Sequence, residues 1–405
     1  MTVRSLAILS YHTSPLAQPG EGDGGGMNVY VRSLASALAR AGVACDVYTR
    51  AEHPEQPPVV VVEPNVRVFN IEAGPRGPVP KEKLGDLVDD FTTAMLAKIR
   101  SCGRAYEAIH ANYWLSGQVA HRLKHELGLP MIVTFHTLAR VKGEKDEPMG
   151  RAEREAEIIR CSDLILASTP LEAGQLKDLY DGSPERIEVL PPGVDHGVFR
   201  PGDQASARRR LGLPGDRVLL FVGRVQPLKG LDLAVECLAE LEDDGTVLWV
   251  VGGPSGADGP GEVARVGALA ERLGVAERVL FLAAQPHEQL ADFYRAADVC
   301  LVPSRSESFG LVALEAAACG TPVVAAKVGG LRSIVEDGVT GFLVQDRDPL
   351  DWATPVALLL DDPDLAHQMG AQAAARSGRW SWCMTAARLR RMFGDLVERT
   401  PVECS

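Results

Sequence analysis

The sequence lacks the signals that would indicate several common classes of protein. Its eight cysteines include no pair with the CxxC spacing of a zinc or redox site, so we expect reduced thiols. No apolar stretch approaches the roughly 20 residues that are needed to cross a bilayer. The formal net charge of -12 would repel a polyanion, which disfavours binding to nucleic acid or to anionic membranes. We therefore expect a cytoplasmic protein with no nucleic-acid partner and no membrane span.

The length of the chain and the order of its apolar segments indicate two α/β domains. A chain of 405 residues is too long for one compact core. Short apolar runs alternate with longer amphipathic stretches, which is typical of a parallel sheet covered by helices. We predict doubly wound domains over residues 1–197 and 198–378, and a C-terminal helix over 379–405 that can pack back on the first domain. Open α/β sheets bind ligands at the carboxyl ends of their strands, so we expect the active site in the cleft between the domains.

Two groups of residues suggest that the chain binds a phosphate-bearing ligand. Glycines crowd the loop over residues 20–26, between the first predicted strand and a helix. Glycine lets a phosphate approach main-chain N–H groups, and the start of a helix adds partial positive charge. Arg224 and Lys229 follow the first strand of the second domain, where two cations suit a diphosphate leaving group. The glycine loop has no GK[ST] ending of a P-loop, and a flexible surface loop is its simpler alternative.

The segment SRSESFGLVALEAAACG places Glu307 before a predicted helix and Glu315 a little over two turns further along. Both carboxylates could therefore point toward the cleft from the same side of the helix. The chain has 54 acidic residues, so this spacing alone is weak evidence. The Ser-Phe-Gly turn between them offers N–H groups at a helix start and strengthens the prediction of a ligand site.

Further candidates follow predicted strands or turns of the first domain, where a ligand bound in the cleft would contact them. Taken singly, a residue of this kind is more often a surface or structural residue than a ligand contact. They are His12, Asn28, Lys81, Tyr113, His136, Thr137 and Arg151.

Together these segments resemble the retaining glycosyltransferases of family four. That family has the GT-B fold, with two Rossmann-like domains facing a central cleft, and its signature is the pair seen here as Glu307 and Glu315. Within the family, the segments HTSPLAQPGEGDGGGMNVYVRSLA, PKEKL, NYWLSGQVA and HTLARVK are similar to the enzymes that glycosylate inositol 3-phosphate in the first step of mycothiol biosynthesis. The resemblance implies a homodimer that transfers N-acetylglucosamine from UDP-N-acetylglucosamine to 1D-myo-inositol 3-phosphate.

The resemblance also implies a role for each candidate residue. The catalytic residues would be His136, Arg224, Lys229 and Glu307. The donor would be bound by Gln18, Pro19, Gly26, Arg224, Lys229, Glu307, Phe309, Gly310 and Glu315. The acceptor would be bound by His12, Asp23, Asn28, Lys81, Tyr113, Thr137 and Arg151. A magnesium ion, which the chemistry does not require, would be held largely by main-chain oxygens near Tyr294, Arg295, Ala297 and Thr321.

The sequence shows no pair of acids arranged for double displacement, so we expect transfer on the front face of the sugar. The acceptor hydroxyl would attack from the side on which the diphosphate leaves, and Arg224 and Lys229 would stabilise the charge of the leaving group.

Three alternatives stay open at this point. A family-four enzyme with a different donor or acceptor, such as a natural-product or sucrose-type enzyme, would share the fold. A sugar-nucleotide sensor without catalytic activity would also keep it. A NAD-dependent oxidoreductase fits the rhythm of strands and helices, but we do not interpret the glycine loop as a dinucleotide fingerprint.

Overall fold

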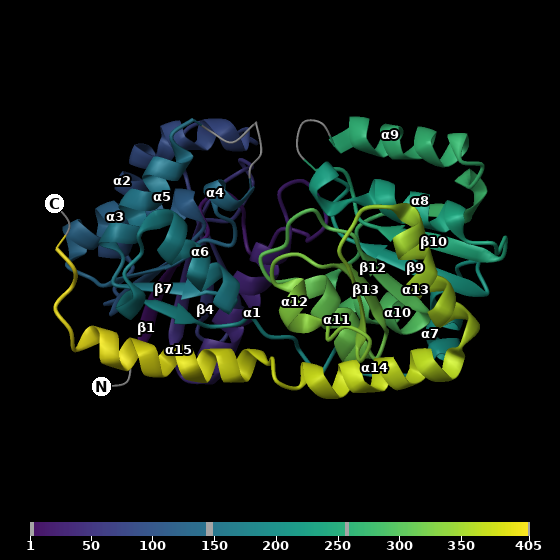
Figure 1. Ribbon diagram of the computed structural model, residues 1–405. Helices are drawn as coiled ribbons and strands as arrows, with labels where there is room; N and C mark the ends of the chain where they lie inside the picture. Colours follow the sequence, from purple (N-terminus) through teal and green to yellow (C-terminus); the bar gives the residue numbers. More distant parts are fainter. Residues whose placement is uncertain (1–3, 143–148, 256–258, 404–405) are drawn as a thin grey trace. The chain divides into compact units, whose positions relative to one another are not determined.

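The computed structural model describes residues 4–142, 149–255 and 259–403, and these divide into two compact units (Figure 1). Unit 1 contains the chain up to residue 17, residues 27–191 and residues 382 onward. Unit 2 contains residues 18–26 and 192–381. Each unit is an α/β layer structure, as the sequence predicts.

The unit boundaries differ from the expected domains in three places. The second unit begins at Pro192 rather than at residue 198, and the final helix starts at Trp382 and belongs to unit 1. The glycine-rich loop over 18–26, which we assigned to the first domain, groups with unit 2. A short segment near the amino terminus is therefore part of the later unit.

Unit 1 is built on an eight-stranded sheet in the order β3-β4-β2-β1-β5-β6-β7-β8, in which only β3 and β4 pair antiparallel. The strands are β1 (Ser5–Leu9), β2 (Ala44–Arg50), β3 (Val59–Glu63), β4 (Val66–Ile71), β5 (Ala108–Asn112), β6 (Met131–Thr134), β7 (Leu164–Ala167) and β8 (Ile187–Val189). Every residue of β1 is buried, as expected for a strand covered on both faces.

The helical segments of unit 1 are α1 (Gly26–Arg40), η1 (Lys81–Leu87), α2 (Val88–Ser101), α3 (Trp114–Leu127), α4 (Ala139–Lys142), α5 (Arg151–Cys161), α6 (Pro170–Tyr180), η2 (Pro184–Arg186) and α15 (Trp382–Val397). α15 packs on unit 1 through the edge of Trp382 against the ring of Tyr30, with centroids 5.6 Å apart, and through a 2.7 Å hydrogen bond from Arg390 to the carbonyl oxygen of Ala41.

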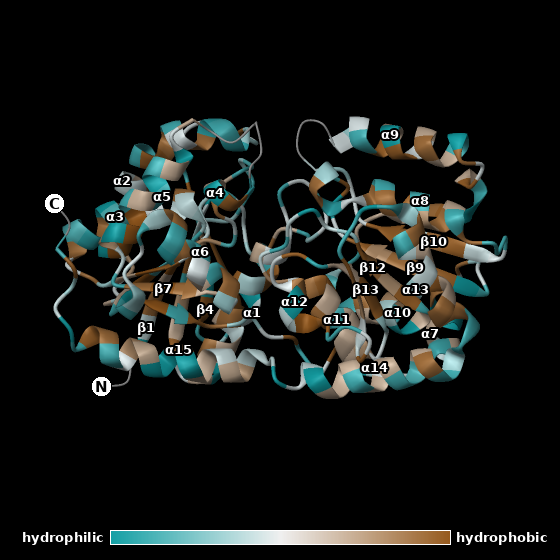
Figure 2. Cartoon of the chain, viewed as in Figure 1, coloured by the Kyte–Doolittle hydropathy of each residue, from teal (hydrophilic) through white to brown (hydrophobic). Residues whose placement is uncertain are grey.

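Unit 2 contains a parallel six-stranded sheet in the order β11-β10-β9-β12-β13-β14. Its strands are β9 (Arg217–Val222), β10 (Thr246–Val251), β11 (Val279–Leu282), β12 (Val299–Val302), β13 (Val323–Ala326) and β14 (Gly341–Val344). They are mostly hydrophobic in Figure 2, in agreement with a core made largely of strand residues.

The helical segments of unit 2 are α7 (Gln204–Leu211), η3 (Pro227–Lys229), α8 (Leu231–Glu240), α9 (Gly259–Arg272), η4 (Ala276–Arg278), η5 (His287–Gln289), α10 (Leu290–Ala296), α11 (Leu311–Cys319), α12 (Leu331–Ile334), α13 (Pro349–Asp361) and α14 (Pro363–Ser377). α11 is buried from Ala313 to Cys319. It is therefore a core helix, and Glu315 is one of its buried residues.

Each sheet has one point where the strand order reverses. In unit 1 the chain leaves β1 for β2 on one side and returns to β5 on the other. In unit 2 it leaves β9 for β10 and returns to β12. Ligands of open α/β sheets bind at such switch points, beyond the carboxyl ends of the strands. The segments after β1 and β5, and those after β9 and β12, are therefore the places to search for function.

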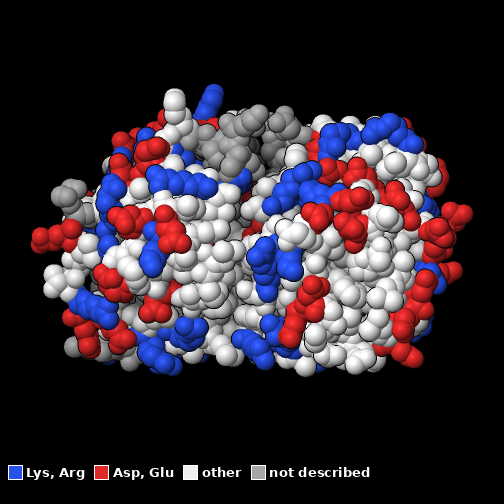
Figure 3. All heavy atoms as spheres, viewed as in Figure 1, with Lys and Arg blue, Asp and Glu red and all other residues white. Residues whose placement is uncertain are grey.

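Among the described residues, no helix is long and apolar enough to cross a membrane. Acidic and basic side chains are intermingled over the face drawn in Figure 3.

The free cysteines are Cys45, Cys102, Cys237, Cys300, Cys319 and Cys383. Cys161 is disulfide-bonded, so the expectation of reduced thiols is wrong for this residue.

Candidate active site

The glycine-rich loop of unit 2 is held in place by main-chain hydrogen bonds. The Gly20 N–H donates to the Gly24 carbonyl at 3.0 Å, and the Gly253 N–H donates to the Gly20 carbonyl at 2.8 Å. A Cβ at Gly24 would lie 2.4 Å from the carbonyl oxygen of Gln18, so a larger residue does not fit there. The Gln18 amide also donates to the carbonyl of Gln285. These bonds argue against the simpler interpretation of a flexible surface loop.

Arg224, just after β9, lies against this loop. A Cβ on Gly25 would be 3.3 Å from the Arg224 Nε, so the absence of a side chain at Gly25 lets the guanidinium come close. Arg224 Nη1 donates to the Ser255 hydroxyl at 3.1 Å, and that hydroxyl donates to the Gly22 carbonyl at 2.8 Å. Two motifs that are about 200 residues apart in the sequence thus form one cationic, amide-bearing surface.

The spacing of Gly20, Gly22 and Gly25 does match the GxGxxG pattern of dinucleotide sites. In such sites the first glycine makes the tight turn directly after the strand. Here residues 10–19 separate the end of β1 from Gly20. The loop therefore does not have the geometry of a dinucleotide fingerprint.

Lys229 and Glu307 meet at the switch point of unit 2. Lys229 Nζ donates to Glu307 Oε2 at 2.6 Å, and the two side chains are 24% and 18% exposed. Lys229 ends η3 after β9, whereas Glu307 follows β12. The pair therefore places one cation and one carboxylate at the expected ligand position, where the cation can face a diphosphate and the carboxylate can accept bonds from sugar hydroxyls.

Two glycines fix the turn that carries Glu307. The Gly330 N–H donates to the Glu307 carbonyl at 2.9 Å. A Cβ at Gly329 would lie 1.7 Å from that same carbonyl oxygen, and a Cβ at Gly330 would lie 2.4 Å from Phe309. Gly310 has a φ of 102° at the start of α11, in the region that favours glycine. The main-chain N–H groups near Phe309 and Gly310 are thereby held at the N-terminal end of α11.

Glu315 has different surroundings from Glu307. It is 4% exposed, and its two oxygens lie 2.7 Å from His287 Nε2 and 2.9 Å from the Tyr294 hydroxyl. Burial opposes a charge on His287, but the carboxylate of Glu315 outweighs it and raises the pKa of that imidazole. Binding ribose hydroxyls at Glu315 would therefore require them to compete with His287 or Tyr294.

In unit 1, four of the predicted acceptor residues meet around one aromatic ring. The Lys81 ammonium lies 4.8 Å and the Arg151 guanidinium 5.0 Å from the ring centre of Tyr113, and the His12 ring lies 4.5 Å away. Arg151 Nη2 also donates to the carbonyl and the hydroxyl of Thr137, at 2.9 and 3.0 Å. Two cations, an aromatic ring and a hydroxyl are thus gathered at the switch point between β1 and β5.

Tyr113 itself has an unusual backbone. Its φ of 78° lies in the region that non-glycine residues rarely adopt, at a cost of about 1–3 kcal/mol, and such strain often marks functional sites. The Tyr113 N–H donates to the Thr134 carbonyl at 2.8 Å, and Tyr113 directly precedes α3 as its N-cap, so both strand and helix hold it in place.

The other two acceptor candidates lie apart from this ring. Asn28 is buried on α1 and donates to the Thr13 hydroxyl at 2.9 Å and to the Ser14 carbonyl at 2.6 Å. It therefore supports the segment that follows His12. Asp23 is exposed on the glycine-rich loop and groups with unit 2 rather than with the other acceptor candidates. Pro19 lies on the same loop.

His136 follows β6 with a φ of 62°. Its Nε2 lies 3.0 Å from the amide oxygen of Asn112, and its ring centre lies 4.8 Å from that of Tyr30. Burial, helped by the neighbouring His110, lowers the pKa of His136 to about 3. His136 is therefore neutral at physiological pH and suits a hydrogen bond to a sugar hydroxyl better than proton donation by an imidazolium.

The four groups expected near a magnesium ion lie at the amino ends of the strands of unit 2. Tyr294, Arg295 and Ala297 precede β12, and Thr321 precedes β13, whereas the phosphate-binding candidates follow the carboxyl ends of strands. The Thr321 hydroxyl donates to the Tyr294 carbonyl at 2.6 Å, so two of the four oxygens do converge.

These groups are neutral oxygens, with no carboxylate among them. Among the described residues, no cluster of three or more His, Cys, Asp and Glu side chains could hold a metal ion. Mg²⁺ is usually bound through at least one carboxylate. The set therefore lacks the charged ligand that Mg²⁺ usually takes, and it lies away from the candidate phosphate-binding residues.

Some site residues carry no clear signal in the sequence. Glu155, Asn112 and His287 contact Arg151, His136 and Glu315, respectively, yet each is an ordinary polar residue in its segment. Only the spacing of four between Arg151 and Glu155 could have suggested their pairing on a helix.

Comparison with known proteins agrees with this geometry. The sequence-family model of the glycosyl transferase 4-like domain matches residues 25–193, and that of the glycosyl transferases group 1 matches residues 203–376. The D-inositol 3-phosphate glycosyltransferase of Segniliparus rotundus is 48% identical over 95% of this chain and 87% of its own length. The enzyme of the same name from Acidothermus cellulolyticus is 47% identical over 98% of this chain and 92% of its own length.

Two solved structures show the same architecture. Sucrose-phosphate synthase from Thermosynechococcus elongatus has a TM-score of 0.91 and 34% identity, and the match covers 97% of this chain and 99% of that one. Anabaena HepE has a TM-score of 0.78 at 21% identity over 96% and 99% of the two chains, a level at which only the fold is informative.

The fold and the two clusters of site residues define a glycosyltransferase of the GT-B class, as the sequence predicts. This excludes the oxidoreductase alternative. Within that class the chain belongs to the family of the D-inositol 3-phosphate glycosyltransferases.

Proposed function

We propose that the enzyme transfers N-acetylglucosamine from UDP-N-acetylglucosamine to 1D-myo-inositol 3-phosphate, the first step of mycothiol biosynthesis. The observation that carries the proposal is the cluster in unit 1, where Lys81 and Arg151 flank the ring of Tyr113 and Thr137 adds a hydroxyl. A neutral acceptor has no need of two cations at one point, whereas a phosphate monoester does.

The donor is assigned to unit 2. Arg224 beside the glycine loop and Lys229 beside Glu307 supply the positive charge for its diphosphate. The amides near Phe309 and Gly310 and the carboxylate of Glu307 then hold the sugar. The Gly26 amide, at the start of α1, adds a donor for phosphate oxygen. Gln18 and Pro19 border the nucleotide, and Glu315 binds its ribose.

The chemistry follows from these groups with retention at the anomeric carbon. The bond from that carbon to the β-phosphate oxygen breaks, and the acceptor hydroxyl forms its bond on the same face. The hydroxyl proton passes to a phosphate oxygen of the departing UDP. Because the acceptor hydroxyl itself attacks the anomeric carbon, no protein carboxylate becomes covalently attached. Arg224 and Lys229 stabilise the charge that grows on the diphosphate, and neutral His136 accepts or donates a hydrogen bond at the 6-hydroxyl of the sugar. His12, Asp23 and Asn28 are assigned to the inositol ring.

The deciding experiment supplies the protein with a panel of nucleotide sugars and with either inositol 3-phosphate or inositol. The expected product has the mass of N-acetylglucosaminyl inositol phosphate. We expect UDP release with inositol alone to be slower by at least about tenfold, because the free energy of one charge-assisted hydrogen bond to the phosphate is lost. Equal rates with the two acceptors would refute the acceptor assignment. Activity only with a hexose phosphate would favour the sucrose-type alternative, to which the likeness with sucrose-phosphate synthase points. Absence of UDP release with every acceptor would favour a sensor.

Three further properties are proposed with it. We infer a homodimer in the cytoplasm, which sedimentation and cell fractionation would test. We also infer that any bound Mg²⁺ is structural and is held by main-chain oxygens of Tyr294, Arg295 and Ala297 with the hydroxyl of Thr321. Metal analysis of the purified protein tests binding, and an unchanged kcat after chelation with a lower thermal midpoint tests the structural role.

A further inference from the structure

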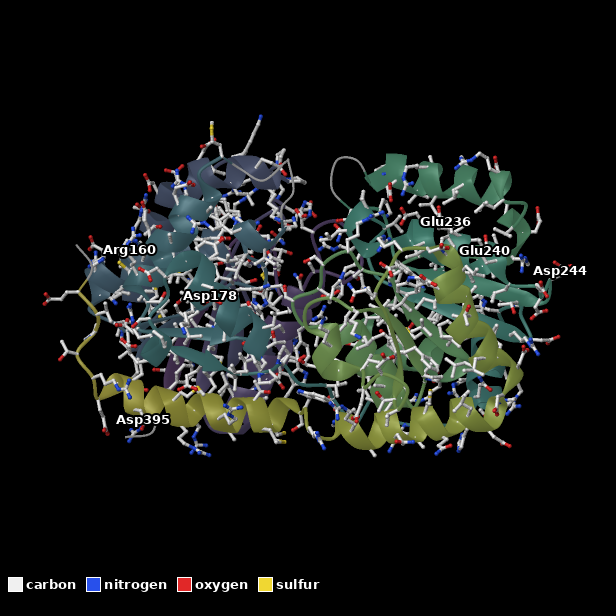
Figure 4. The ribbon with its side chains drawn as sticks, viewed as in Figure 1. Arg160, Asp178, Glu236, Glu240, Asp244 and Asp395 are labelled. Atoms are coloured by element: carbon white, nitrogen blue, oxygen red, sulfur yellow. The ribbon has the colours of Figure 1, made fainter. Side chains whose placement is uncertain are left out.

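Behind the acceptor cluster lies a carboxylate with no exposed surface. Glu155 is on α5, four residues after Arg151, and Arg151 Nε donates to its Oε1 at 2.7 Å. Its other oxygen accepts from the Ala139 N–H at 2.9 Å and from the Tyr180 hydroxyl. The donors thus come from α5, from the start of α4 and from the end of α6. Figure 4 labels Arg160 and Asp178, which mark α5 and α6.

This carboxylate determines the orientation of Arg151. The Nε edge of the guanidinium is bound to Glu155, while Nη2 donates to Thr137 and the plane lies over Tyr113. A guanidinium is a rigid planar fork, so fixing one edge fixes the direction of the others. Glu155 also holds the N–H of Ala139, two residues after Thr137. One side chain therefore sets the geometry of both Arg151 and Thr137.

The same carboxylate balances the charge of Arg151 in the protein interior. The Arg151 side chain is 1% exposed, and a buried cation without a counter-charge is strongly unfavourable. When a phosphate arrives, the Thr137 side chain can release its bond from Nη2, which leaves that N–H for a phosphate oxygen without turning the guanidinium. Glu155 can keep its bond to Nε throughout, so the guanidinium stays aligned.

We propose that Glu155 is a positioning residue for the acceptor phosphate, acting through Arg151 and Thr137. The inference rests on the proposed function, because it assumes that Arg151 binds that phosphate. One opposing effect has to be weighed: a carboxylate near a phosphate also repels it. The close bond from Nε and the complete burial favour orientation as the larger effect.

The test replaces Glu155 with Gln, which keeps the shape and removes the charge. We expect the KM for inositol 3-phosphate to rise about tenfold, while kcat/KM for unphosphorylated inositol changes less than twofold. The matched control is Glu157→Gln, the same change at an exposed position of the same helix, which should leave both constants unaltered. A merely structural role would lower activity with both acceptors alike.

Several outcomes would overturn the inference. They are an unchanged preference for the phosphorylated acceptor in E155Q, an equal loss with both acceptors, and a lower KM for inositol 3-phosphate, which would show that repulsion dominates. If E155Q does not fold, Tyr180→Phe decides: it removes one donor to Glu155, and we expect about a threefold rise in the same KM. No rise in Y180F would then refute the role. A wild-type enzyme that does not discriminate between the two acceptors would refute the proposed function as well, whereas discrimination kept by E155Q would refute the inference alone.

Discussion

Replacing Lys229 with Met is the sharpest test of the donor site. Lys229 Nζ lies 2.6 Å from Glu307 Oε2, and both side chains are mostly buried, at 24% and 18% exposure. The substitution removes a cation from the diphosphate position and leaves the Glu307 carboxylate without that partner. One charge-assisted hydrogen bond is worth about 1.5–3 kcal/mol. That corresponds to a loss of about 10- to 150-fold, and the repulsion between Glu307 and the diphosphate adds to it. We expect kcat/KM to fall at least about 100-fold.

The assay is UDP release with saturating acceptor and varied donor. Because charge on the diphosphate grows as the sugar bond breaks, kcat should fall more than the donor KM rises. Lys177→Met, at an exposed position of α6, is the matched control and should behave as wild type. A K229M enzyme with kcat/KM within about twofold of wild type would refute the reasoning, since a cation at the reacting diphosphate cannot be dispensable.

Three further predictions concern other residues. Lys81→Met should raise the KM for inositol 3-phosphate by about tenfold but leave turnover of inositol unchanged, with exposed Lys83→Met as control; equal effects of the two variants would contradict the phosphate assignment. The raised pKa of His287 means that its pairing with a buried carboxylate is complete below about pH 6.5 and is lost as the pH rises through the raised pKa. The thermal midpoint of wild type should therefore fall over that window relative to that of H287Q. If the thermal midpoints of the two proteins change with pH in parallel, His287 does not contribute to stability in this way. Gly329→Ala should abolish activity and lower the thermal midpoint because its Cβ would meet a carbonyl oxygen, whereas Gly267→Ala in open space should be tolerated; a fully active G329A would disprove the close contact.

The fold was predictable because alternating apolar and amphipathic stretches report directly on parallel strands and their helices. The assignment of the glycine loop was not, because it depends on a hydrogen bond from Gly253 to Gly20 that no local pattern reveals. His12 and Tyr113 in unit 1, and Arg224 and Glu307 in unit 2, follow strands at a switch point, which the strand order explains.

Side-chain partners were predictable only where the family resemblance named them. It assigned Lys81, Tyr113 and Arg151 to one site, and the three side chains lie together in the structure, but it gave no hint that Tyr113 adopts a positive φ. The spacing of Glu307 and Glu315 suggested a shared ligand, yet in the structure they have separate partners. A helix repeat gives the direction of a side chain only roughly, and the neighbours that complete its surroundings come from distant segments.

The first and last described residues, 4 and 403, belong to unit 1, and unit 2 consists of residues 192–381 with the small segment 18–26 added to it. Anyone who wishes to exchange the half that we propose to bind the sugar nucleotide cannot simply cut the gene in two. A working chimera would need joins near residues 191 and 381, would have to leave α15 with the amino-terminal parent, and would have to transplant the glycine loop together with the half that lies far downstream of it.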